Sequence, residues 1–228
     1  MILGSNNFLK DLSILYMNIE INKVKSDYIN EMTDIVMNSY KEERKLLPYL
    51  PFEDKLKKKI ENNIEELISD GTGVVAKRNN KIIGFLTGYK VPEFWGNCKG
   101  IYSPDFGHGT IKKERKKIYQ KLYKYAAKSW VNNGYTHHAL TIYAHDEVTI
   151  NTFFWLGFGL RCIDAMRKTE LVENINDEIN ILKVETDSIS DLSENQNELH
   201  NYFKKSPIFM PVDKQDPEVY LQKWLEKD

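Results

Sequence analysis

The sequence predicts a domain of the α/β class, or of the α+β class by some criteria. Three observations predict it: a strand and two helices open the chain, a β-hairpin follows, and a long helix between two apolar segments forms a β-α-β unit. The chain has 228 residues, of which 41% are hydrophobic, so it can build a sizeable core. We assign this domain to residues 17–170 and treat residues 1–16 as an N-terminal extension.

The opening segment predicts a strand followed by two helices. Apolar residues in 19–24 lie close to a period of two, which is typical of a strand, and in 26–40 they recur at helical spacing. Pro48 and Pro51 interrupt this pattern. A second helix is predicted at 56–67, where one apolar stripe lies opposite a face rich in Lys and Glu.

The middle of the chain predicts a β-hairpin and one further strand. Apolar runs at 74–76 and 82–86 are separated by turn residues, as in a hairpin. Residues 100–103 form a short strand in this interpretation. Residues 103–110 are expected to form a loop because of their glycine, proline and aspartate content.

The β-α-β unit completes the predicted domain. Apolar residues between 118 and 130 have the spacing of a long helix that ends at Gly134. The pattern then predicts a buried strand at 139–144, a helix at 148–156 and a last strand at 160–166.

Charge, cysteine content and hydropathy exclude several functions. The chain has 32 Lys and Arg and 33 Asp and Glu, so no global field favours nucleic acid as a partner. Two cysteines form neither a disulfide scaffold nor a thiolate zinc site. No apolar run approaches the ~20 residues that a membrane helix needs. We therefore expect a cytoplasmic protein without a nucleic-acid, membrane or metal partner.

The C-terminal segment, residues 171–228, repeats the start of the domain. Residues 179–189 match residues 19–29 at six of eleven positions, at a constant offset of 160 residues. We interpret the segment as a linker and the start of a second, incomplete copy in a tandem repeat. Its apolar residues are expected to pack on the first domain, or on another chain as a homodimer contact.

The densest polar constellation lies at the start of the long predicted helix. Asp105 and His108 precede it in a glycine-containing loop, and five of the six residues in 112–117 are Lys or Arg. Cations at the positive end of a helix dipole are unfavourable unless an anion binds there, and free helix amides add a phosphate-binding geometry. The alternative is that the lysines simply point into water. The predicted anion-binding residues are Thr110, Lys112, Arg115, Lys116 and Lys117.

A second polar group follows the buried strand at the end where open α/β sheets place their ligands. It consists of His145, Asp146 and Glu147. An imidazole beside a carboxylate can act as a general base. The alternative is that Asp146 or Glu147 only caps the next helix.

Residues 74–167 resemble the GNAT superfamily of acetyl-CoA-dependent N-acetyltransferases. The order of hairpin, strand, loop, long helix, strand and short helix is similar, and the final FFWLGF at 153–158 is similar to the Tyr-x-x-x-Gly-Phe signature. The resemblance covers about residues 18–170. It implies a GNAT-like mixed, mostly antiparallel twisted sheet with helices on both faces, and acetyl transfer to a primary amine of a small molecule or peptide.

The sequence departs from the superfamily at three positions. An Arg or Gln followed by spaced glycines normally cradles the pyrophosphate, but residues 114–119 contain no glycine and end in Tyr119. Phe153 replaces the usual tyrosine acid, and Asp146 stands where an asparagine often meets the pantetheine arm. Side chains either replace the backbone amides as anion donors, or the domain is a degenerate, non-catalytic copy beside a second catalytic domain.

For an active domain, the resemblance implies direct attack of the amine on the acetyl thioester. A base must first take a proton from the ammonium group. The candidate bases nearest in sequence are His108, Asp105 and His145, and Tyr102 is the candidate acid. Acetyl-CoA would contact the anion-binding residues above together with Tyr119, Asp146 and Phe153.

Overall fold

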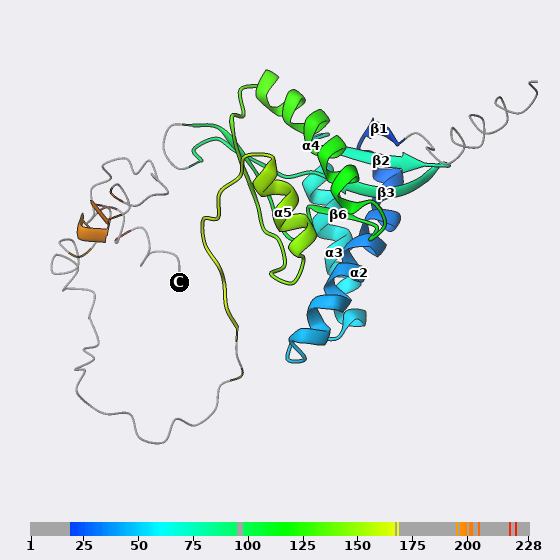
Figure 1. Ribbon diagram of the computed structural model, residues 1–228, viewed down its shortest axis with the longest axis horizontal. Helices are drawn as coiled ribbons and strands as arrows, with labels where there is room; N and C mark the ends of the chain where they lie inside the picture. Colours follow the sequence, from blue (N-terminus) through cyan, green and yellow to red (C-terminus); the bar gives the residue numbers. More distant parts are fainter. Residues whose placement is uncertain are drawn as a thin grey trace, which may run out of the picture. The chain divides into compact units, whose positions relative to one another are not determined.

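The computed structural model describes residues 19–94, 98–166 and 168, and a few single positions between 195 and 222. Residues 19–94 and 98–158 belong to one compact unit, and the residues from 159 onward belong to a second unit. The predicted N-terminal extension and most of the predicted second copy lie outside the described residues. The elements and the site that follow are those of the first unit (Figure 1).

The element order confirms the predicted opening strand, helices, hairpin and β-α-β unit. The first half contains β1 (Glu20–Lys23), the short 3-10 helix η1 (Ser26–Tyr28), α2 (Ile29–Leu46), α3 (Glu53–Ile68), β2 (Val74–Arg78) and β3 (Lys81–Leu86). The second half contains β4 (Tyr89–Val91), β5 (Gly100–Ser103), β6 (His108–Thr110), α4 (Arg115–Asn132), β7 (His137–Leu140) and α5 (Glu147–Trp155).

The strands form a mixed, mostly antiparallel arrangement, as predicted. Four strands lie in the order β1-β2-β3-β6 and all of them pair antiparallel. Three strands lie in the order β4-β5-β7, in which β4 and β5 pair antiparallel and β5 and β7 pair parallel. Residues 104–107 carry the chain from β5 in one group to β6 in the other, so the strands separate at this point.

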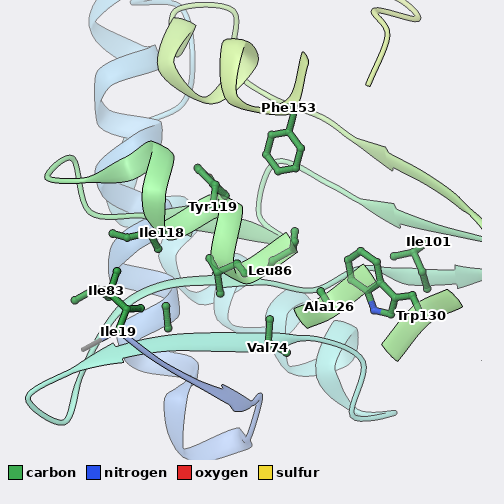
Figure 2. Close-up of a cluster of buried hydrophobic side chains, with 12 residues drawn as sticks. Ile19, Val74, Ile83, Leu86, Ile101, Ile118, Tyr119, Ala126, Trp130 and Phe153 are labelled. Carbon is green, nitrogen blue, oxygen red and sulfur yellow. The ribbon is translucent and has the colours of Figure 1, made fainter. Parts of the chain in front are cut away.

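Helices cover both faces of the strands, because neighbouring strand residues point to opposite sides. Val74 packs in a buried cluster with α4 residues such as Leu122, and this cluster includes Phe153 of α5 (Figure 2). Val75 packs on the other side, with Met32 of α2 and α3 residues. The start of α4 and the middle of α2 are therefore held on either side of β3 and β6.

Two predicted elements differ from the structure. Residues 103–110 were expected to be a loop, but residues 108–110 form β6, which pairs with β3 and is buried. Gly109 is needed there because a Cβ would lie 2.6 Å from Cγ2 of Ile35 in α2. The buried strand predicted at 139–144 ends at Leu140, and residues 160–166 form no strand. Among the described residues, no helix has the length and hydropathy needed to span a bilayer.

Candidate functional site

The candidate site lies where the parallel strands β5 and β7 stop pairing and the segments that follow them diverge. The last bond of the pair runs from the amide of Thr141 to the carbonyl of Ser103, at 2.9 Å. Beyond this bond, the segment after β5 turns through residues 104–107 into β6, and the segment after β7 continues to α5. His108 crosses the gap, because its Nε2 lies 2.9 Å from the carbonyl oxygen of Thr141.

His108 is held in its neutral form by this arrangement. Its side chain is buried, and the loss of solvent lowers its pKa below the ordinary value. Nε2–H therefore donates to Thr141, and Nδ1 accepts from the hydroxyl of Tyr119, which lies 2.8 Å away. Both ring nitrogens of His108 are thus already bonded within the protein.

Tyr119 and Phe153 fill the space between α4 and α5 beside the same gap. Tyr119 is 2% exposed, and its ring packs edge-on to His108 and to Phe153, with centroid separations of 5.7 Å and 5.4 Å. Figure 2 shows Tyr119 and Phe153. Burial also raises the pKa of Tyr119, so it stays a neutral phenol. The two helices are therefore in direct contact through aromatic rings.

An ion pair joins the starts of the same two helices. Arg115 in the first turn of α4 lies 2.7 Å from Asp146, the N-cap residue of α5, and their side chains are 15% and 14% exposed. Asp146 also accepts from the amide and the hydroxyl of Thr149. Burial would raise the pKa of Asp146, but the hydrogen bonds from Thr149 and Arg115 lower it below its ordinary value. Asp146 therefore caps α5, as one of the sequence interpretations proposed.

A cavity of about 820 Å³ lies between α2, the residues before α4 and the start of α5. The cations that line it are Lys41, Arg44, Lys45, Lys112 and Arg115. The carboxylates that line it are Glu42, Asp146 and Glu147. Glu42 is shared between two ammonium groups, because it lies 3.0 Å from Lys45 and 3.1 Å from Lys112.

His145 projects into the wall of this cavity in a fixed position. Its Nδ1 lies 2.6 Å from Oε2 of Glu43, and its ring stacks on Tyr143 with a centroid separation of 5.8 Å. Tyr143 in turn donates to Asp105 at 2.9 Å. Burial and the Asp105 carboxylate raise the pKa of Tyr143, so its proton stays on the hydroxyl.

The predicted catalytic residues fall into two pairs. Asp105 and His145 are linked through Tyr143, whereas Tyr102 and His108 both hydrogen-bond Thr141. Sequence reasoning missed Glu43, Tyr143 and Thr141. No signal in the sequence indicated them, because Tyr143 and His145 lie in a turn closed by the bond from the Asp146 amide to the Tyr143 carbonyl, and Glu43 is distant along the chain.

The predicted anion-binding residues are not all brought together. Thr110, Lys112 and Arg115 line the cavity, whereas Lys116 and Lys117 do not. Lys117 lies 3.6 Å from Glu114. Glu114 itself has φ 59, a left-handed conformation that favours glycine, and its carboxylate pairs with Arg78.

Comparison with solved structures identifies the fold. A GCN5-related N-acetyltransferase from Ralstonia eutropha JMP134 matches 69% of this chain and 99% of its own, with a TM-score of 0.51 and 14% identity. The fold is that of the GCN5-related N-acetyltransferases. A paia N-acetyltransferase from Thermoplasma acidophilum in complex with coenzyme A also matches, with a TM-score of 0.48, 19% identity and coverage of 65% of this chain and 94% of that chain. No family model and no curated protein matches the sequence.

In this GNAT fold, the residues at the start of α4 do not fit acetyl-CoA in the way the resemblance implies. Where spaced glycines would cradle the pyrophosphate, the chain has Arg115 paired with Asp146. Tyr119 and Phe153, which the resemblance implies as contacts of acetyl-CoA, pack against each other, and Tyr119 also packs against His108. Side chains of this protein therefore fill the space between α4 and α5, whereas the cavity in front of the first turn of α4 stays open.

Proposed function

We propose that this domain has the N-acetyltransferase fold but works as a non-catalytic, ligand-binding domain. The observation that supports this function is that Arg115, at the start of α4 where the resemblance implies a glycine cradle, is already paired with Asp146 of α5. Freeing Arg115 by moving α5 away from α4 would separate an ion pair that is about 15% exposed and two rings that are 2% exposed. Both steps are unfavourable, because a charge or an apolar ring would lose its partner.

The second candidate is an N-acetyltransferase that uses acetyl-CoA and acts on a primary amine of a small molecule or peptide. The Glu43–His145 pair favours it, because a carboxylate that fixes one imidazole nitrogen leaves the other to act as a general base. This candidate would place the phosphates of acetyl-CoA in the cavity that Thr110, Lys112 and Arg115 line, in front of the start of α4.

The remaining sequence hypotheses fit beside the non-catalytic function. We propose that residues 171–228 begin a second copy of the fold, that catalysis belongs to that second copy, and that the C-terminal segment makes a homodimer contact. A cytoplasmic location is part of the same proposal. Light scattering of the protein tests the dimer, since a monomer mass would contradict it.

The decisive experiment compares acetyl-CoA with adenosine 3′,5′-bisphosphate, which lacks the pantetheine arm, by isothermal titration calorimetry. If the domain is non-catalytic and does not hold the pantetheine arm, acetyl-CoA binds no more tightly than the nucleotide, and no free thiol appears when amines are added. Acetyl-CoA binding that is more than about tenfold tighter would show that the pantetheine arm is held, and would overturn the non-catalytic function.

A further inference from the structure

Beyond its first turns, α4 presents a row of lysine side chains on the flank that faces β1. Lys121, Lys124 and Lys128 recur at intervals of three and four residues, so they lie on one side of the helix within about 10 Å along its axis. Nζ of Lys121 lies 3.4 Å from the carbonyl oxygen of Ile19, the residue before β1, which shows the direction of this flank. Lys124 and Lys128 are exposed to solvent.

A fourth cation joins this row from β1. Ile19 and Ile21 belong to the cluster that packs on α4, so Lys23 points to the same side of the strand and Glu20 points to the other. Lys23 also lines a recess together with residues of α4. We call the surface formed by Lys23 and the three lysines of α4 the lysine face.

The charges of the lysine face are not compensated within the part of the chain that the structure describes. α4 contains neither Asp nor Glu, and no ion pair involves any lysine of this face among the described residues. The helix on the other side of the strands differs, because Lys57 and Lys58 of α3 pair with Asp34 and Glu61. Like charges one turn apart are unfavourable on an isolated helix, and an acidic partner would remove that cost.

The recess beside the lysine face adds an apolar component. It has a volume of about 540 Å³ and lies between β1, the start of β2 and the C-terminal half of α4. Ile21, Val74 and Ala126 line it together with the ring of Tyr125, which is 55% exposed. The surface therefore offers cations next to an aliphatic and aromatic hollow. A polypeptide with both acidic and aliphatic side chains satisfies the two parts, whereas a nucleic acid supplies charge but no aliphatic side chain.

The chain itself contains a segment of this composition. Residues 170–194, which lie outside the described residues, contain eight Asp or Glu and only one Lys or Arg. This imbalance is local, because the whole chain has 33 acidic and 32 basic residues. Nine Leu, Ile or Val residues are interspersed among the acidic ones. We call residues 170–194 the acidic segment.

The position of the last residues of the domain favours a contact between two copies. The rings of Phe158 and Tyr123 lie edge-on with their centroids 5.1 Å apart. Tyr123 is two positions from Lys121, so the two side chains point to nearly opposite sides of α4. The domain therefore ends on the flank of α4 away from the lysine face. In a two-fold dimer, each acidic segment can meet the lysine face of the other copy, and both contacts form together.

We infer that the lysine face docks the acidic segment of a second copy of this chain. This assignment rests on the proposed homodimer, because it names the two surfaces that form it. Carboxylates of the segment pair with the lysines, and its aliphatic side chains enter the recess. Since the paired charges lie at the surface, the dimer should weaken as salt concentration rises.

An exchange of charge between the two surfaces tests the inference in the full chain. Reversal of either surface alone should raise the dimer dissociation constant at least about tenfold, as measured by light scattering and sedimentation. A one-to-one mixture of the two variants should restore the dimer, because each acidic surface then meets a basic surface on the other copy. The two variants are Lys121→Glu/Lys124→Glu/Lys128→Glu and Glu173→Lys/Asp177→Lys/Glu178→Lys.

The matched control reverses three lysines of α3, which packs on the other face of the strands. It changes the net charge equally and should leave the dimer intact. Thermal unfolding of each variant separates a folding defect from a loss of contact. If the α4 variant unfolds at a lower temperature, Lys124→Gln/Lys128→Gln replaces it, because both side chains are exposed. The control variant is Lys55→Glu/Lys58→Glu/Lys59→Glu.

The outcomes distinguish this inference from the proposed function. A monomer mass for the unmodified chain overturns the homodimer and the inference together. A dimer that persists in the α4 variant, or a mixture that stays monomeric, overturns the inference alone. Binding of a single-stranded oligonucleotide that is lost in the α4 variant, while the dimer persists, assigns the lysine face to nucleic acid and also overturns it. The acetyl-CoA titration bears only on the non-catalytic function.

Discussion

Asp146→Asn should destabilise the domain by about 2 kcal/mol, because it removes one charge of the pair that holds α4 against α5. Asparagine caps a helix about as well as aspartate, so the cap on Thr149 is retained. The loss falls on Arg115, which is only 15% exposed and keeps its charge without a carboxylate. Breaking a fully buried pair costs about 3–5 kcal/mol, and partial access of water reduces that figure here.

Urea unfolding at pH 7 measures this free energy, and a double-mutant cycle with Arg115→Gln isolates the coupling between the two side chains. We expect a coupling of about 1–2 kcal/mol. Asp34→Asn is the matched control, because Asp34 pairs with Lys57 on the surface and should cost less than about 1 kcal/mol. A coupling near zero would refute the claim that this pair holds α4 against α5.

Three further predictions concern the buried contacts around the same gap. Tyr119→Phe should cost about 1–2 kcal/mol in urea unfolding, because it leaves Nδ1 of His108 without a donor; an unchanged midpoint would contradict this. Burial lowers the pKa of His108 below 6.5, so as the pH falls the unfolded chain binds a proton before the folded protein does. The contribution of His108 to the free energy of unfolding is therefore constant above pH 6.5 and decreases below it. An equal fall in melting temperature with pH in His108→Asn would contradict this. Gly109→Ala should cost about 1–3 kcal/mol by collision with Cγ2 of Ile35, and it should cost less in an Ile35→Ala background, which lacks that methyl group; additive effects of the two substitutions would contradict the collision.

Much of the fold could be predicted because its signals are local. Helical spacing and the proline breaks located α2 and α3, and the turn before Lys81 located the hairpin. β6 was missed because its residues, His108, Gly109 and Thr110, are typical of a loop, and they form a strand only through pairing with β3. The strand predicted to run to residue 144 ends at Leu140 because its partner β5 ends at Ser103.

The candidate site was predictable only in part. The run of cations at 112–117 indicated an anion site, and Lys112 and Arg115 do line the cavity. The sequence could not reveal that Arg115 is already paired with Asp146, 31 positions further along the chain. Nor could it reveal Glu43 beside His145, because these two residues are 102 positions apart and are brought together only when α2 packs against β6.

The sequence by itself determined the order of elements, the cluster of polar residues before α4 and the absence of a glycine cradle, because each of these depends only on residues that are close together in the sequence. The tertiary structure alone decided what those residues do. Whether a lysine faces water or a cavity, and whether Tyr119 meets a ligand or Phe153, depends on which distant segments pack together. Packing therefore filled the space between α4 and α5 and left a cavity in front of the start of α4.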